Sequence, residues 1–169
     1  MMTLAELNAL PAERFVALLG AVFEHSPWVA ERAAKARPFR SRTELLDEMR
    51  SVVQRASAAE QLALIRAHPQ LGARGRSRAQ LTEASAKEQR RAGLDACTGE
   101  EFSRLMQLNS AYVEKFSFPF ILAVRGHTPE SILGALRSRL ENDAQSERHA
   151  ALSEIGLIGG YRLEDIVES

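Results

Sequence analysis

The sequence predicts an all-α protein, a single-domain multi-helix bundle spanning residues 1–169. Apolar residues recur at intervals of three and four along most of the chain, which is the spacing of one helix face. Three pairs of Ser or Thr with Glu stand at the spacing of the capping box that begins a helix. A chain of 169 residues is long enough for one substantial core and short for two domains.

The N-terminal part of the chain is predicted to contain three helices. Apolar residues in 4–23 keep helical spacing, and Pro11 divides them into a short helix and a longer one. Ser26 then supplies an N-cap, and Pro27 a first-turn proline, for a helix that runs to about Ala36.

Three capping boxes predict the next helix starts, because the two side chains of each box satisfy free backbone amides of the first turn. The boxes are Ser41 with Glu44, Ser57 with Glu60 and Thr98 with Glu101, and their helices cover about 43–55, 58–67 and 99–116. The last helix carries a core-like stripe that includes Asn109 and Tyr112. These two side chains need hydrogen-bond partners if they are buried.

The run FSFPFILAV at 116–124 is the one place where a strand competes with a helix. No other segment supplies a partner strand, so we expect a buried turn leading into a short helix. Thr128 is then the predicted N-cap, and Pro129 the first residue, of a further helix that runs to about Glu141.

The last helix is predicted to begin near Ala144 and to continue through Gly159 and Gly160 to Val167. Two glycines inside a helix each cost about 1 kcal/mol relative to alanine. They therefore mark either a kink or a place where another group packs close to the backbone.

Composition and charge exclude several classes of protein. The chain carries 22 basic and 22 acidic residues, a balance that argues against a nucleic-acid partner. Its single cysteine, Cys97, cannot form an internal disulfide and has no Cys or His neighbours at metal-ligand spacing. The sequence shows neither a signal peptide nor an apolar run of roughly 20 residues. We expect a cytoplasmic protein without a membrane partner.

A His-Pro pair marks the candidate active site. Pro69 disfavours the helical conformation at His68, so the preceding helix is expected to end at or just before the histidine. The negative end of a helix dipole favours a protonated imidazole by about 0.3–1 kcal/mol. Thr82 is the predicted N-cap of the next helix, which runs to about Ala92 with Gly93 after its C-cap.

Ser85, Glu88 and Gln89 stand at i, i+3 and i+4 of that next helix and share one face. If this face meets His68, an acid/base residue gains a carboxylate partner. The alternative is structural, with a histidine that only forms a turn and a helix face that is only solvated. The sequence has no Gly-rich phosphate loop, nucleophile elbow or HExxH motif. This leaves acid/base chemistry without a cofactor, or a regulatory helical module.

The arginine-rich loop 73–79 is the most basic piece of the chain. Two interpretations are open for it. It is either a solvated loop or a segment that grips a phosphate or the substrate.

Four blocks of sequence in a fixed order carry a family resemblance: HPQLG (68–72), LTEASAKEQRRAG (81–93), LNSAYVEKFSFPFILAVRG (108–126) and YRLEDIV (161–167). With these blocks the chain resembles the 2-oxo-4-hydroxy-4-carboxy-5-ureidoimidazoline (OHCU) decarboxylase family over nearly its whole length. The resemblance implies an all-helical fold, a homodimer, and neither a metal nor an organic cofactor.

The resemblance also implies a catalytic pair and a substrate-binding set. His68 matches the family's proton donor, and Glu88 matches its partner. The substrate-binding positions are Pro69, Ser85, Ala86, Lys87, Glu88, Gln89, Phe120, Ile121, Leu122, Ala123, Val124 and Arg162. Arg162 could pair with a substrate carboxylate or carbonyl through two parallel hydrogen bonds. Ala86 and Lys87 replace more acidic or amide residues of relatives, which bears on substrate affinity and not on the acid/base pair.

The implied activity is decarboxylation of OHCU to (S)-allantoin and CO2 in urate degradation. In that substrate a ring imine adjoins the carbon that bears the carboxylate, so the imine can accept the electron pair that a cofactor otherwise takes. The protein must orient the carboxylate and protonate one face of the ureido-bearing carbon. Which of His68 and Glu88 handles which proton is open. Two alternatives are a non-catalytic helical interaction module and a decarboxylase of a related ureido or imidazoline carboxylate.

Overall fold

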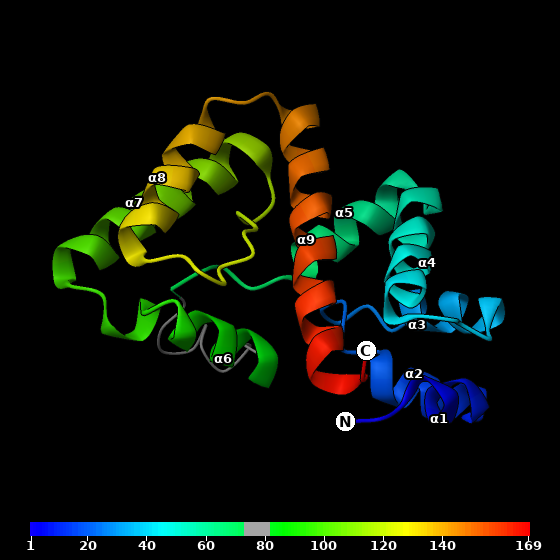
Figure 1. Ribbon diagram of the computed structural model, residues 1–169. Coiled ribbons are helices and arrows are strands. Elements are labelled where there is room, and N and C mark those ends of the chain that lie inside the picture. The colour runs from blue at the N-terminus through cyan, green and yellow to red at the C-terminus, as the bar shows by residue number, and fades with distance from the viewer. Residues whose placement is uncertain (73–81) are drawn as a thin grey trace. The chain divides into compact units, whose positions relative to one another are not determined.

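The computed structural model describes residues 1–72 and 82–169, and the predicted all-α class is confirmed there (Figure 1). The α-helices in these ranges are α1 (Leu4–Ala9), α2 (Ala12–Leu19), α3 (Trp28–Ala33), α4 (Arg42–Arg55), α5 (Ala58–Ala67), α6 (Glu83–Arg91), α7 (Gly99–Phe116), α8 (Pro129–Leu140) and α9 (Ala144–Ile166). Two short 3-10 helices, η1 (Ala34–Ala36) and η3 (Leu94–Ala96), and an isolated parallel bridge between Met2 and Val167 accompany them. None of the helices in the described ranges is long and apolar enough to cross a bilayer.

The chain divides into two compact units, which are best described one at a time. Unit 1 comprises Met1–Ala67 and Ile155–Ser169, and unit 2 comprises His68–Glu154. Helix α9 therefore contributes its first turns to unit 2 and its last turns to unit 1. The expectation of one domain over residues 1–169 stays a prediction.

The predicted helix starts are confirmed where a side chain caps the first turn. Thr98 forms a complete capping box at α7, and Thr128 caps α8 with Pro129 in the first turn. Ser41 and Ser57 each accept a hydrogen bond from the backbone N–H three residues on, at 3.0 and 3.1 Å. Cap chemistry is local, which is why the sequence alone could place these starts.

The N-cap predicted at Ser26 is wrong. Its hydroxyl donates a hydrogen bond to the Glu24 carbonyl at 2.9 Å, and Pro27 occupies the N-cap position of α3 without a side-chain cap. The hydroxyl is thus directed to the backbone of the preceding loop and not to the first turn of α3. The single helix predicted to about Ala36 is divided into α3 and η1.

Unit 1 buries the apolar faces of its helices together. Leu7, Phe15, Leu19, Leu45 and Met49, from α1, α2 and α4, are completely buried. Burial of side chains of this size is the main stabilising contribution to a helical unit.

The two glycines of α9 mark close packing and not a kink, since the helix runs unbroken from Ala144 to Ile166. A Cβ atom at Gly159 would lie 3.2 Å from the Phe23 ring, and one at Gly160 would lie 3.1 Å from Cδ2 of Leu46. Side chains of unit 1 therefore pack directly on the backbone of this part of α9.

Helix α7 forms the centre of unit 2. Leu105, Asn109, Tyr112 and Phe116 lie on one face of it and are buried, as the sequence pattern predicts. The centroid of the Tyr112 ring is 4.6 Å from that of Phe116 and 5.4 Å from that of Phe120. Helices α7 and α8 lie side by side (Figure 1). Unit 2 is thus built around one buried helix face that contains two polar side chains.

The chain between α7 and α8 forms neither the short helix nor a strand, so the predicted turn into a short helix is wrong in its second part. Helix α7 ends at Phe116, and Ser117 adopts a left-handed conformation with φ 62°. Residues 118–124 are irregular, and all but Pro119 are buried. Gly126, at φ 80°, then turns the chain toward α8. The partners of this backbone are distant side chains, which no local pattern could reveal.

Candidate active site

His68 lies in the interior directly after a helix. Helix α5 ends at Ala67, as Pro69 predicts, and only 6% of the His68 surface is exposed. The Nε2 atom of the ring is enclosed and makes no hydrogen bond within the described ranges, although the residue does have interaction partners. The histidine is therefore not the solvated turn residue that the structural alternative assumed.

The turn that follows His68 and Pro69 is fastened to two helices of unit 2. The backbone N–H of Gly72 donates to Oε1 of Gln89 at 3.0 Å, and Nε2 of Gln89 donates to the Gln70 carbonyl at 3.4 Å. Nδ2 of Asn109 on α7 donates to the Leu71 carbonyl at 3.0 Å. These bonds link the chain beside His68 to α6 and α7.

Gly72 is required for this turn. Its φ of 73° is a conformation that residues with side chains rarely adopt, and an added Cβ atom would lie 2.4 Å from Cδ2 of Leu105. The close approach of the backbone to α7 thus depends on the missing side chain.

Helix α6 turns the predicted face inward. It begins at the N-cap Thr82, whose hydroxyl accepts from the backbone N–H of Ser85 at 3.2 Å. Ser85 and Gln89 are buried, whereas Glu88 is half-buried. Of the other two predicted positions, Ala86 is half-buried and Lys87 is exposed. The Glu88 carboxylate is thus partly accessible and lies one turn of α6 after the buried Ser85.

The segment Phe120–Val124, which the sequence analysis predicts to bind the substrate, is buried in unit 2. Two charged side chains supply hydrogen bonds to its backbone. Arg139 of α8 donates from NH1 to the Ile121 carbonyl, and the N–H of Ala123 donates to Oε2 of Glu154 at 2.8 Å. The backbone of this irregular segment is therefore fixed by ionised groups and not by secondary structure.

Arg139 belongs to a buried cluster that the sequence analysis missed. Its Nε atom donates to both oxygens of Glu147, at 2.8 and 3.0 Å, and Tyr112 donates its phenol proton to Oε1 of Glu147 at 3.0 Å. Burial, together with the Glu147 charge, raises the pKa of Tyr112 far above its usual range. Only the positions of the two charged residues could have indicated this cluster. Arg139 follows the buried Leu136 by three residues and Glu147 precedes the buried Ala151 by four, so each charge lies on the buried face of its helix.

Arg162 lies in unit 1, whereas all other predicted site residues lie in unit 2. Its NH1 atom is 2.6 Å from Oε2 of Glu24 and donates longer bonds of 3.4 Å to the carbonyls of Ala21 and Val22. Both members of this ion pair are buried. Within its own unit, Arg162 thus supports the irregular chain between α2 and α3.

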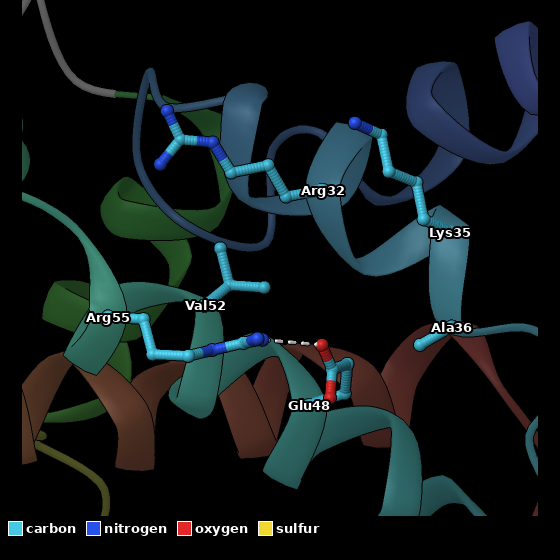
Figure 2. A pocket seen from close by; sticks show the side chains of 6 residues that line it. All are labelled: Arg32, Lys35, Ala36, Glu48, Val52 and Arg55. Carbon is cyan, nitrogen blue, oxygen red and sulfur yellow. Dashed lines mark hydrogen bonds and ion pairs between the residues drawn. The ribbon is translucent and has the colours of Figure 1, made fainter.

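Figure 2 shows a surface hollow of about 420 Å³ in unit 1, which is lined by Arg32, Lys35, Ala36, Glu48, Val52 and Arg55. Arg55 pairs with Glu48 at 2.8 Å, and Arg32 pairs with Glu60 at 2.6 Å. None of the predicted site residues lines this hollow, and three of its four charged side chains, Arg32, Glu48 and Arg55, are engaged in ion pairs. We therefore do not assign the active site there.

Two further expectations concern metals and the basic loop. Among residues 1–72 and 82–169, no group of three or more His, Cys, Asp or Glu side chains could hold a metal ion. The arginine-rich loop 73–79 lies outside the described residues, so the choice between its two interpretations is still open.

Fold and site together describe an all-α protein in which the turn after a buried histidine is bonded to a helix that bears a carboxylate, and these residue types are suited to acid/base chemistry. The chain belongs to the OHCU decarboxylase family, because the family model described as OHCU decarboxylase matches residues 8–164.

Individual relatives agree with this assignment. The 2-oxo-4-hydroxy-4-carboxy-5-ureidoimidazoline decarboxylase of Haloferax volcanii is 40% identical over 164 residues, which cover 97% of this chain and 95% of that protein. The uric acid degradation bifunctional protein of Bacillus sp. (strain TB-90) is 44% identical over 166 residues, or 98% of this chain and 32% of that protein. A crystal structure of (S)-allantoin synthase matches with a TM-score of 0.82 and 28% identity, covering 99% of this chain and 55% of that one. The chain thus spans about a third of the longer bifunctional protein.

Proposed function

We propose that this chain decarboxylates OHCU to (S)-allantoin and CO2 in urate degradation, without a cofactor. Membership of the family supports the proposal, and the Haloferax volcanii relative carries this activity in its name. One structural observation carries it. His68 is buried, and the turn after it is bonded through Gln89 to the helix that bears Glu88.

The substrate itself can accept the electrons that the reaction releases. As the bond between the ring carbon and the carboxylate breaks, its electron pair forms a carbon–carbon double bond within the ring, and the imine nitrogen takes up a proton. The hydroxyl then loses its proton to become the ring carbonyl, while the ureido-bearing carbon gains one. Proton delivery from a single face of the ring gives a single enantiomer.

His68 is proposed as the proton donor to that carbon and Glu88 as its partner. A half-buried carboxylate can orient an imidazole and stabilise its protonated form. The ring would be held by Ser85, Gln89 and the backbone of Phe120–Val124. Gln89 retains one N–H and one lone pair beyond its bonds to Gly72 and Gln70. Pro69, Ala86, Lys87 and Arg162 enter the proposed binding set through the family resemblance alone.

To test this proposal, the unstable substrate OHCU is generated from urate in situ, and the appearance of (S)-allantoin is followed by circular dichroism. Added wild-type protein is expected to accelerate its appearance, and His68→Ala is expected to abolish that acceleration while helical content is preserved. The matched control is His149→Ala, because His149 is exposed on α9. Decay at the spontaneous, racemic rate in the presence of the wild-type protein would contradict the proposed function.

Two other outcomes correspond to the alternatives. Turnover of a different ureido or imidazoline carboxylate in a substrate panel would indicate a related decarboxylase. Absence of turnover with every substrate would favour a non-catalytic helical interaction module.

A homodimer in the cytoplasm, with one domain over residues 1–169, completes the proposal. The homodimer rests on the family resemblance, and light scattering on the purified chain tests it directly. A mass equal to that of one chain, 18.7 kDa, at micromolar concentration would contradict it.

A further inference from the structure

The segment Phe120–Val124 is buried and yet has no regular structure, so its backbone polar groups need specific partners. The Ile121 carbonyl accepts from NH1 of Arg139, and the Ala123 N–H donates to Glu154 at 2.8 Å. The Val124 carbonyl accepts from the backbone N–H of His127 at 2.9 Å. The first two bonds fix the peptide groups on both sides of Leu122, and the third fixes the peptide group that follows Val124.

The orientation of these peptide groups determines where the backbone of Leu122 points. In a planar trans peptide the N–H points away from the C=O of the preceding residue. Because the Ile121 carbonyl faces Arg139, the N–H of Leu122 faces the opposite way. Because the Ala123 N–H faces Glu154, the carbonyl of Leu122 faces away from Glu154. Within the described part of the chain, neither group of Leu122 makes a hydrogen bond.

Arg139 is itself held in one orientation. Glu147 is completely buried and accepts two hydrogen bonds from Nε of Arg139, while Tyr112 donates to the same carboxylate. The Arg139 guanidinium also lies 4.6 Å from the centroid of the Phe120 ring, at cation–π distance. One guanidinium therefore contacts the segment at two successive residues, through a ring face and a carbonyl.

We propose that Arg139, oriented by Glu147, is a positioning residue that turns the backbone N–H and C=O of Leu122 toward the substrate, with Glu154 holding the next peptide group. A donor and an acceptor side by side on one residue match the adjacent N–H and C=O of a ureido group or a cyclic urea. This inference rests on the proposed function, because it assigns a role in binding the same substrate. Arg139 acts through the segment and is not proposed to touch the reacting atoms.

The test compares Arg139→Met with Arg139→Lys and with Arg137→Met, a control on the same helix at an exposed position. Loss of backbone alignment weakens binding of the ring in the ground state and the transition state alike, so KM should rise about tenfold with kcat nearly unchanged. Arg139→Lys keeps a donor for the Ile121 carbonyl and should recover part of this loss. Arg137→Met should behave as the wild type. A role limited to stability would lower the melting temperature and leave KM unchanged, and that result would overturn the proposal.

Hydrogen exchange provides a second measurement that does not depend on turnover. Backbone amides of the segment from Phe118 to Gly126 should exchange faster in Arg139→Met than in Arg137→Met. If Arg139→Met does not fold, Glu147→Gln serves in its place, since it keeps an acceptor for Tyr112 but weakens the hold on Arg139. An inactive wild-type protein would contradict the proposed function. In that case the deciding measurement is amide hydrogen exchange. Faster exchange in Arg139→Met would support the proposal that Arg139 holds the segment, and unchanged exchange would overturn it.

Discussion

Among the residues that the structure describes, unit 1 and unit 2 each contain a buried arginine–glutamate pair, and the two pairs are built alike but connect different parts of the chain. In unit 1 Arg162 lies 2.6 Å from Glu24, and in unit 2 Arg139 lies 2.8 Å from Glu147. In both pairs the carboxylate is completely buried, and the arginine also donates to carbonyls of an irregular segment. In both units, an arginine that is paired with a buried glutamate thus supplies hydrogen bonds to buried backbone that has no secondary structure.

The two pairs differ in whether the carboxylate belongs to the irregular segment itself or to a separate helix. Glu24 belongs to the same loop as the carbonyls of Ala21 and Val22, so the pair in unit 1 secures one loop to α9. Glu147 stands on α9, while Arg139 stands on α8. With Tyr112 of α7 as a third member, the pair in unit 2 joins three helices to the segment Phe120–Val124. Removal of a carboxylate should therefore affect the two units unequally.

The largest expected effect comes from removing each carboxylate separately. Glu24→Ala and Glu147→Ala each leave a buried guanidinium without its counter-charge, which costs about 3–5 kcal/mol of the free energy of unfolding. Glu147→Ala should be the more destabilising by about 1 kcal/mol, because Tyr112 also loses its acceptor. Urea denaturation measures both. Equal losses would contradict the view that the cluster in unit 2 connects more of the chain.

Replacing both charges of a pair should cost less than removing one. Two double variants test this, Arg162→Met with Glu24→Leu and Arg139→Met with Glu147→Leu. Neither leaves a charge of the pair buried, but each leaves backbone carbonyls without a hydrogen-bond donor, at a cost of about 1–3 kcal/mol. Each double variant is therefore expected to be more stable than the corresponding single glutamate variant. Double-mutant cycles on urea midpoints give the coupling energy, and a double variant less stable than its single counterpart would argue against a charge penalty.

Tyr112 predicts that the stability of unit 2 depends on pH in the alkaline range. Its raised pKa means that the unfolded chain loses the phenol proton near the ordinary value of 10.0 while the folded chain keeps it. The folded state then binds more protons, so this stability is fully present below pH 10.0 and is lost as the pH rises beyond it. Urea midpoints followed from neutral to alkaline pH should fall more steeply for wild type than for Tyr112→Phe. Identical slopes would show that the phenol does not contribute.

The smallest effect is expected for an exposed pair. Arg40 and Glu44 lie 3.1 Å apart on the surface, with 90% of the Arg40 side chain exposed. Solvent screens such a pair almost completely. Arg40→Ala should leave the urea midpoint unchanged within error, and a clear shift would mean that burial is not what distinguishes the two interior pairs.

Local chemistry explains what the sequence could predict. Thr98, Thr128 and Thr82 cap helices through bonds that span three residues, and these starts follow from spacing alone. The end of α5 before Pro69 follows from a steric rule for the residue before proline. The inward face of α6 follows from helical periodicity.

Interactions between distant residues explain what the sequence could not predict. The Ile121 carbonyl and Arg139 are 18 residues apart, and Tyr112 and Glu147 are 35 apart. An apolar run around a proline cannot show that its backbone partners lie on later helices, which is why a helix was wrongly expected there. The role of Gln89 in bonding the turn after His68 is likewise a contact between separate elements.

Gly72 offers a way to displace the turn after His68 without changing any group that carries a charge or a proton. Its left-handed backbone lets the turn after His68 approach Leu105 so closely that even a methyl group would collide. Gly72→Ala would leave His68, Glu88 and both arginine pairs chemically intact while displacing the turn that Gln89 and Asn109 hold. The geometry of the candidate site is therefore sensitive to the gain of a single methyl group at a position that carries none of its polar side chains.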